Sequence, residues 1–186
     1  MPAASEFQTL QDLIDHAKAN PGLVTFSGSG SNTSNHLAQQ RFDEMTGVTT
    51  TYVPFSGTGP AVTAILGSQT MAGFNYVTSG VNNSEGMRML AVASEERVKA
   101  FPDVPTFKEI GIDLVGGAYR GVAVPKSTPE EIRVKLSEII SQINADPEFV
   151  KQMEGAGFVL TDIAYEDMPT ADQASLRHGN PQLPAG

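Results

Sequence analysis

A chain of 186 residues is long enough for one ordinary domain or for two small lobes, and too short for two full-sized domains. Its formal net charge of -9, without a cluster of Lys and Arg, excludes a protein that binds nucleic acid or an anionic membrane through charge. The sequence has no cysteine, which excludes disulfides, thiolate chemistry and Cys-based metal sites.

Helix and strand patterns alternate along the first part of the chain. Thr9 and Asp12 have the spacing of a capping box, and Pro60 suits the first position of a helix. Apolar residues at helical spacing predict helices over 9–19, 33–46 and 60–66. Runs rich in β-branched and apolar residues predict strands over 23–27, 49–53, 71–77 and 87–93. This alternation predicts an α/β fold with a mainly parallel sheet flanked by helices.

The second part of the chain is predicted to be mainly helical. Thr106 and Glu109 form a second capping box, which predicts a short helix. After a strand expected over 119–124, an isoleucine-rich apolar face predicts a long helix from about residue 128. Asp146, followed by proline, is predicted to start another helix.

Neither end of the chain has the pattern of an export signal or of a membrane-inserted segment. Met1 to Asn20 has no basic-then-apolar signal peptide, so we expect any export signal to precede these residues. No apolar run approaches the roughly 20 residues of a transmembrane helix. Residues 169–186 show no periodicity, and we expect them to be disordered.

Two loops rich in Gly, Ser and Thr, each between a predicted strand and a predicted helix, are the strongest functional signal. In open parallel sheets, ligands bind beyond the carboxyl ends of the strands, where helix N-termini offer unpaired N–H groups to an anion. The residues expected to supply hydroxyl and backbone donors are Ser29, Gly30, Ser31, Asn32, Thr33, Ser34, Ser56, Gly57, Thr58 and Gly59. The alternative is that these residues only form tight turns and helix caps.

The sequence gives less support to nucleotide binding, serine catalysis and metal binding. The loops lack the third glycine of a dinucleotide motif and the Lys-Ser/Thr pair of a P-loop. His36 lies one helical turn beyond Asn32 and could act as the base for Ser29 or Ser31, which leaves a serine hydrolase or transferase as an alternative function. Otherwise His36 is a hydrogen-bonded structural group. The three histidines are too scattered to predict a metal site.

Two arginines lie within predicted strands. Arginine in such a place pairs with a buried acid or reaches the carboxylate of a ligand, and both interpretations stay open for Arg88 and Arg120.

Several short motifs follow one another in a recognisable order. They are Asn20-Pro21-Gly22, Gly30-x-x-Thr33-x-x-His36-Leu37, Val53-Pro54-Phe55-x-Gly57-x-x-Pro60-Ala61, Leu66-Gly67-x-Gln69, Arg88-x-Leu90-Ala91-Val92, Pro102-Asp103-Val104-Pro105-Thr106 and Gly121-Val122-Ala123-Val124-Pro125-x-x-Thr128-Pro129. From about Phe7 to Met168, this order resembles the TctC or Bug family of solute-binding receptors.

The resemblance implies a periplasmic protein of the periplasmic-binding-protein type, built from two α/β lobes, without enzymatic activity or a cofactor. It implies a small carboxylate ligand, bound between the lobes and delivered to membrane permease subunits. It also implies that the second lobe contributes two loops to this cleft, one with Gly30, Thr33 and His36 and one with Phe55, Gly57 and Pro60. The strand with Phe74 and Asn75 would line the floor of the cleft.

The same resemblance implies a domain organisation. Residues 7–114 correspond to the ligand-binding lobe that is the family's second domain, residues 115–168 to the crossover and the first lobe, and residues 169–186 to a disordered tail. The strand and glycine-rich loop with which family members begin have no counterpart, so we expect half of the cleft to be missing. A homodimer is then expected to cover apolar surface, and a truncated remnant that transports nothing is a further alternative.

Two departures from the family pattern lie near the loops. Asn32 stands where glycine is usual, and Ser68-Gln69-Thr70-Met71 replaces the common Gly-Gln-Val-Asp, so that an acidic position is lost. These departures leave the identity of the ligand open.

Overall fold

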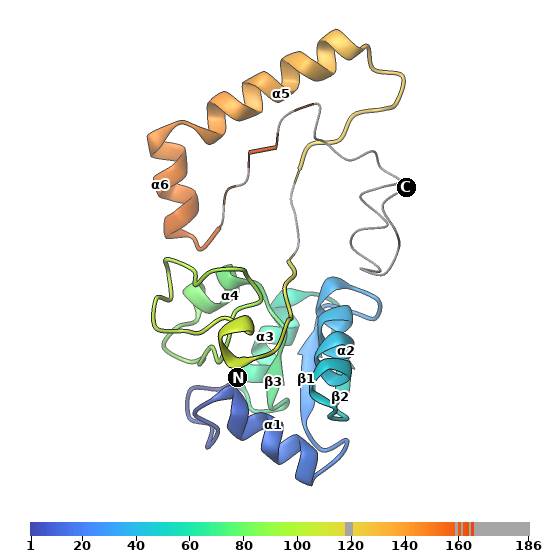
Figure 1. The fold of residues 1–186 in the computed structure, drawn as a ribbon, viewed down its shortest axis with the longest axis vertical. Coiled ribbons are helices and arrows are strands. Elements are labelled where there is room, and N and C mark those ends of the chain that lie inside the picture. Colours follow the sequence, from blue (N-terminus) through green and yellow to red (C-terminus); the bar gives the residue numbers. More distant parts are fainter. Residues whose placement is uncertain (118–120, 159, 161, 164, 166–186) are drawn as a thin grey trace. The chain divides into compact units, whose positions relative to one another are not determined.

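The computed structural model describes residues 1–117, 121–158, 160, 162–163 and 165. The chain divides into two compact units, Met1–Ala118 and Tyr119–Gly186 (Figure 1). The first unit contains the sheet and the predicted loops, and the second contains two long helices within its described part.

A three-stranded parallel sheet forms the centre of the first unit (Figure 1). Its strands are β1 (Thr25–Gly28), β2 (Thr51–Pro54) and β3 (Ala72–Gly73), in the order β2-β1-β3. The pairing register places Gly28 beside Pro54 and Ser27 beside Gly73. Because every pair is parallel, the three strands end at the same edge of the sheet. The predicted α/β fold with a parallel sheet flanked by helices is confirmed.

Helical crossovers connect the strands. α2 (Ser34–Thr46) joins β1 to β2, and α3 (Thr58–Leu66) joins β2 to β3. α2 ends at Gly47, whose φ of 67° is the left-handed conformation that glycine adopts without strain. α3 begins at Thr58 rather than at the predicted Pro60, and a proline within the first turn is tolerated because no N–H there has an intrahelical acceptor.

The N-terminal helix α1 (Leu10–Ala19) confirms the first predicted capping box. The Asp12 N–H donates to Oγ1 of Thr9 at 3.2 Å, and the Thr9 N–H donates to Oδ2 of Asp12 at 2.9 Å. The bond from the Thr9 backbone is the main reason why the pKa of Asp12 lies below its ordinary value. The apolar face of α1 is buried in the core through Leu10, Leu13, Ile14 and Ala17.

Four phenylalanine rings form the aromatic centre of the core. Phe26 of β1 stacks on Phe74 with ring centroids 5.3 Å apart, and Phe42 of α2 lies 5.8 Å from each of them. Phe107 packs 6.2 Å from Phe74 and 6.3 Å from Phe42. Truncating one such buried ring to alanine typically costs about 3–5 kcal/mol of folding stability.

The predicted strand over 71–77 is wrong beyond Gly73. Helix α4 (Val77–Asn82) follows shortly after β3. The cause is tertiary: the Phe74 ring packs in the core, and its carbonyl oxygen accepts a hydrogen bond from Nδ2 of Asn35 at 2.6 Å instead of from a neighbouring strand.

The predicted strand over 87–93 is wrong as a continuous strand. The segment pairs through single bridges near its two ends, Met87 with Pro2 in the antiparallel sense and Val92 with Thr106 in the parallel sense. An apolar run indicates burial, but it does not supply a partner strand of matching length.

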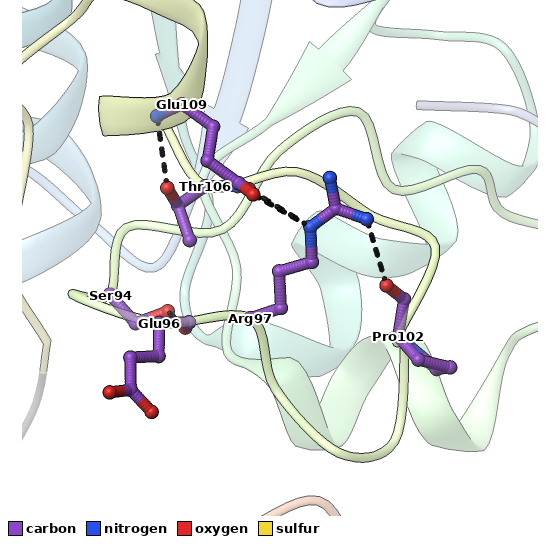
Figure 2. Close-up of polar contacts among 6 residues, drawn as sticks. All are labelled: Ser94, Glu96, Arg97, Pro102, Thr106 and Glu109. Carbon is purple, nitrogen blue, oxygen red and sulfur yellow. Dashed lines mark hydrogen bonds and ion pairs between the residues drawn. The ribbon is translucent and has the colours of Figure 1, made fainter.

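The second predicted capping box is present at η1 (Lys108–Ile110), which is a 3-10 helix. The Glu109 N–H donates to Oγ1 of Thr106 at 3.1 Å, and the Thr106 N–H donates to Oε2 of Glu109 at 2.7 Å. Arg97 extends this arrangement, because its Nε donates to both carboxylate oxygens of Glu109 at 3.0 Å and its Nη1 donates to the Pro102 carbonyl oxygen at 3.0 Å (Figure 2). These bonds close the loop over 97–109 on itself.

The second unit contains α5 (Glu130–Asn144) and α6 (Pro147–Gly155). Asp146 caps α6 as predicted, since its Oδ1 accepts the N–H groups of Glu148 and Phe149, each at 2.9 Å. Neither helix has a buried residue. The predicted apolar face of α5 includes Ile132, Ile139 and Ile143, which are 47%, 42% and 47% exposed.

Some predictions for this unit lie outside the described residues. Residues 121–124 form no strand, whereas 119 and 120 and the predicted disordered segment 169–186 are not among those described. Of the helices that are described, none is long and apolar enough to cross a membrane.

Candidate functional site

Both predicted loops lie at the carboxyl edge of the sheet. Residues 29–33 lead from β1 to α2, and residues 55–57 lead from β2 to α3. The loops begin side by side, because the Phe55 N–H donates to the carbonyl oxygen of Gly28 at 2.8 Å. The end of β3 adds Phe74 and Asn75 to the same edge. The structure thus brings all three predicted segments together.

The first loop has an unusual backbone. Gly30 has φ of 100°, and Asn32 has φ of 59°, which is uncommon for a residue other than glycine. The carbonyl oxygen of Gly30 accepts two hydroxyl groups, Oγ1 of Thr33 and Oη of Tyr52, each at 2.9 Å. These two bonds fix the Gly30 peptide where the chain turns into α2.

Asn35, which the sequence analysis did not single out, ties the first loop to the end of β3. Its Oδ1 accepts the hydroxyl of Ser29, and its Nδ2 donates to the carbonyl oxygen of Phe74 at 2.6 Å. An amide suits this place because it both accepts and donates. A Cβ on Gly28 would overlap the Tyr52 hydroxyl and lie 2.8 Å from Cβ of Asn35, so only glycine fits at the end of β1.

Backbone N–H groups without an acceptor among the described residues gather at this edge. They belong to Thr33, Ser34, Asn35, His36, Thr58 and Gly59. The first helical bonds come later, from Leu37 to Thr33 and from Ala61 to Gly57. Within the described chain, no side chain caps the start of α2 or α3. Unpaired N–H groups and the positive ends of two helix dipoles together favour an anion.

His36 supports the first loop. Its Nδ1 accepts the Asn32 N–H at 3.0 Å, and its ring stacks on Tyr52 with centroids 4.3 Å and planes 25° apart. The Ser29 hydroxyl donates to Asn35, and in the part of the chain that the structure describes no hydrogen bond joins a serine to His36. His36 and Ser29, the base and a candidate nucleophile of the hydrolase hypothesis, are therefore hydrogen-bonded to other residues.

Two tyrosines that the sequence analysis missed complete the edge. Tyr52 comes from β2, and burial is the main reason why its pKa lies above the ordinary value of 10.0. Tyr76 immediately precedes α4, and its hydroxyl oxygen lies 3.3 Å from that of Ser34. Strand alternation places Tyr52 and Pro54 on one face of β2, but nothing local indicates that this face reaches the loop.

The remaining predicted residues differ in exposure. Ser31, Asn32, Ser34, Ser56, Gly59 and Pro60 are exposed, whereas Gly30, Thr33, Phe55, Gly57 and Thr58 are half-buried. The ring of Phe74 belongs to the core, so its polar contribution to the edge is its carbonyl group. The Nδ2 atom of Asn75 is shielded from solvent and has no partner among the described residues.

Among the described residues, Arg88 is hydrogen-bonded neither to a buried acid nor to this edge. Its Nη1 donates to the carbonyl oxygens of Ser5 at 3.3 Å and Phe7 at 3.1 Å, so its role is to hold the N-terminal segment. Arg120 lies outside the described residues. Within them, no group of three His, Asp or Glu side chains could hold a metal ion.

Two surface pockets of the described residues lie away from the candidate site. One is lined by residues of α5 such as Val134 and Ser141, and another by Leu66 and Gly86. Neither includes a predicted site residue, so the candidate site rests on hydrogen-bonding groups and not on the shape of a cavity.

Residues 1–175 match the family model described as "Tripartite tricarboxylate transporter family receptor". A UPF0065 protein encoded in the gbd 5' region of Cupriavidus necator is 34% identical over 155 residues, which cover 80% of this chain and 46% of that protein. The chain spans about half the length of the curated relatives that it matches.

Solved structures with a similar fold include a TctC solute binding protein from Polaromonas. It is 27% identical with a TM-score of 0.74, and the match covers 96% of this chain and 61% of that chain. R. palustris Rpa4515 with adipate has a TM-score of 0.80 at 22% identity, and the match covers 89% of this chain and 56% of that chain. At that identity, the second likeness concerns the fold alone.

Proposed function

The chain belongs to the tripartite tricarboxylate transporter receptor family, and we propose that it serves as a non-catalytic receptor for a small carboxylate. In this proposal it acts in the periplasm and delivers its ligand to membrane permease subunits. Residues 7–114 act as the ligand-binding lobe, and residues 115–168 correspond to the crossover and the first lobe. No cofactor, metal or nucleic acid takes part.

The observation that carries the proposal is the pair of uncapped helix N-termini at one sheet edge. Because β1 and β2 are neighbouring parallel strands, the starts of α2 and α3 offer their N–H groups near each other. A charge-assisted hydrogen bond contributes about 1.5–3 kcal/mol, and a helix dipole adds about 0.3–1 kcal/mol. A carboxylate with two oxygens can accept from both helices without a lysine or arginine.

The proposed ligand-binding residues are those of the three segments at this edge. They are Ser29, Gly30, Ser31, Asn32, Thr33, Ser34, His36, Phe55, Ser56, Gly57, Thr58, Gly59, Pro60, Phe74 and Asn75. Of these, Thr33, Ser34, His36, Thr58 and Gly59 contribute backbone N–H groups without a described acceptor. The adipate of the structural neighbour is a dicarboxylate, which suits the chemistry of such an edge.

Titration calorimetry with adipate, succinate and citrate tests the proposal, with the diamide of adipic acid as the uncharged control. We expect a saturable one-site signal for at least one acid and none for the diamide. The absence of a signal for every acid, or equal binding of the diamide, would contradict the proposal.

A serine hydrolase or transferase is the competing function. Its proposed base, His36, accepts the Asn32 N–H, and Ser29 donates to Asn35, so the geometry favours a binding protein. A fluorophosphonate probe tests the competing function. Covalent labelling of Ser29 or Ser31 would support it.

We also propose self-association into a homodimer. Ile132, Ile139 and Ile143 leave much of the α5 face exposed, and apolar surface of this kind favours a protein partner. Analytical ultracentrifugation should show a dimer at micromolar concentration, and a stable monomer there would contradict this part of the proposal.

A further inference from the structure

We infer that His36 is a positioning residue of the candidate site and that it holds the first loop only in its neutral form. In terms of function, this inference rests on the proposed carboxylate site, because the loop that His36 holds carries the N–H groups of that site. Its structural part concerns the loop itself and can be tested without a ligand.

The hydrogen bond between Asn32 and His36 defines the protonation state of the ring. A backbone N–H can only donate, so the ring nitrogen that receives the Asn32 N–H at 3.0 Å must be an unprotonated acceptor. The imidazole is therefore neutral, with its proton on Nε2. A proton on Nδ1 would set two donors against each other and remove the bond.

This bond acts where the loop backbone is left-handed. Asn32 has φ of 59°, a conformation that is uncommon outside glycine and that asparagine adopts more readily than most residues. The amides of Thr33 to His36, which have no described acceptor, begin at the next residue. A loop that relaxes at Asn32 would therefore change the direction of these donors.

His36 and Tyr52 act as a pair. Their rings stack at 4.3 Å, and while His36 holds the Asn32 N–H, the Tyr52 hydroxyl holds the carbonyl oxygen of Gly30 at 2.9 Å. The two side chains thus fix the peptide groups on both sides of Ser31. Since Tyr52 belongs to β2 and His36 to α2, the loop is clamped between a strand and a helix.

The titratable side chains that face His36 are phenols, which remain neutral near neutral pH. The phenol of Tyr52, from β2, contacts the His36 ring. The phenol of Tyr76, which precedes α4, contributes to the raised pKa of Tyr52. Phenols ionise only near pH 10. Within the described ranges, no carboxylate, ammonium or guanidinium group is bonded to His36. Hence the imidazole is the group at this contact whose protonation would break the bond to Asn32.

Amide hydrogen exchange by NMR tests the inference on the full chain. The measured quantity is the exchange rate of Asn32 divided by that of Gly47, whose N–H donates to the Asp43 carbonyl oxygen at the other end of α2. The ratio cancels the intrinsic effect of pH on exchange. We expect it to rise about tenfold from pH 7.5 to 5.5, which corresponds to the loss of one hydrogen bond.

Two variants separate positioning from mere packing. In His36→Asn, the amide oxygen can take the place of Nδ1 but does not titrate, so the ratio should stay low at both pH values. In His36→Leu, bulk beside Tyr52 remains but the acceptor is lost, so the ratio should be high at both. A constant ratio in the unsubstituted protein, or a ratio in His36→Asn that varies equally with pH, would overturn the inference.

Binding of adipate provides the functional readout. The loss of affinity from pH 7.5 to 5.5 should be several-fold larger for the unsubstituted protein than for His36→Asn, because titration of adipate affects both proteins equally. Equal losses, or tighter binding of the protonated protein, would overturn the positioning role. If no carboxylate binds at any pH, the proposed function fails, while the exchange ratio still decides whether neutral His36 holds the loop.

Discussion

Asn35 accepts the hydroxyl of Ser29 with the same side chain that donates to the carbonyl oxygen of Phe74. One buried amide therefore links β1, α2 and the end of β3. The link explains why the segments of the candidate site stay together although they are far apart in the sequence.

Replacing Asn35 with alanine should lower the free energy of unfolding by about 1–3 kcal/mol, because it leaves the Phe74 carbonyl group and the Ser29 hydroxyl without their partner. Urea denaturation followed by circular dichroism measures the change. The control is Gln40→Ala on the exposed face of α2, which should change stability by less than about 0.5 kcal/mol. Equal effects of the two substitutions would show that the link contributes little.

Replacing Ser34 with proline should weaken carboxylate binding by roughly 10–100-fold, since it removes one N–H donor from the first helical position of α2. The fold should persist, because Thr33 already has the extended ψ of 170° that a following proline requires. Ser34→Ala keeps the N–H and removes only the hydroxyl, so it serves as the matched control in calorimetry. Similar affinities of the two variants would argue against the backbone donor.

Replacing Ser68 with glycine should raise the melting temperature, with a gain of about 0.5–1 kcal/mol in stability. Ser68 follows the end of α3 with φ of 55°, in a conformation that disfavours a side chain. The resemblance to the family also suggests glycine here. The reciprocal substitution Gly47→Ala, at φ of 67°, should lower the melting temperature, and scanning calorimetry of both variants checks the sign.

Replacing Thr70 with valine should stabilise the protein by about 1 kcal/mol, because Oγ1 of Thr70 is buried and has no hydrogen-bond partner among the described residues. Thr106→Val is the matched control: Thr106 is equally buried, but its Oγ1 accepts the Glu109 N–H. That substitution should destabilise the protein. If chemical denaturation shows Thr70→Val to be the more harmful change, the Thr70 hydroxyl must have a partner.

Stability should fall in acid through the Arg97–Glu109 pair. The hydrogen bond from Arg97 and the Thr106 N–H hold the pKa of Glu109 below the ordinary value of 4.5. The contribution of the carboxylate is therefore complete above pH 4.5 and is lost as the pH falls through the lower pKa of the folded state. Melting curves between pH 7 and 3 should show a smaller fall in melting temperature for Glu109→Gln than for the unsubstituted protein. If Arg97→Gln leaves the fall in melting temperature between pH 7 and 3 unchanged, the Arg97–Glu109 ion pair does not cause that fall.

The local features of this fold could be predicted, whereas features set by distant contacts could not. The capping pair of Thr9 and Asp12, the pair of Thr106 and Glu109, and the cap at Asp146 depend on neighbouring backbone groups, so sequence spacing suffices. The strand predicted over 71–77 fails because Phe74 packs on three rings from other segments. Apolar character alone does not distinguish a strand from an irregular buried segment.

In the candidate site too, the locally determined features could be predicted and those set by distant contacts could not. Glycine, serine and threonine marked both loops, because the turn from a strand into a helix needs these residues. Asn35, Tyr52 and Tyr76 escaped notice because their roles depend on partners in other strands and loops. Asn32 and Ser68, noted as departures from a glycine pattern, prove to be the non-glycine residues with positive φ among those described.

Phe74 has its ring among the core aromatics and its carbonyl group in the hydrogen-bond network of the candidate site. A substitution that repacks the core around this ring would therefore displace an anchor of the loops as well. Substitutions selected near Phe74 for thermostability would therefore also move the backbone of the proposed ligand-binding loops.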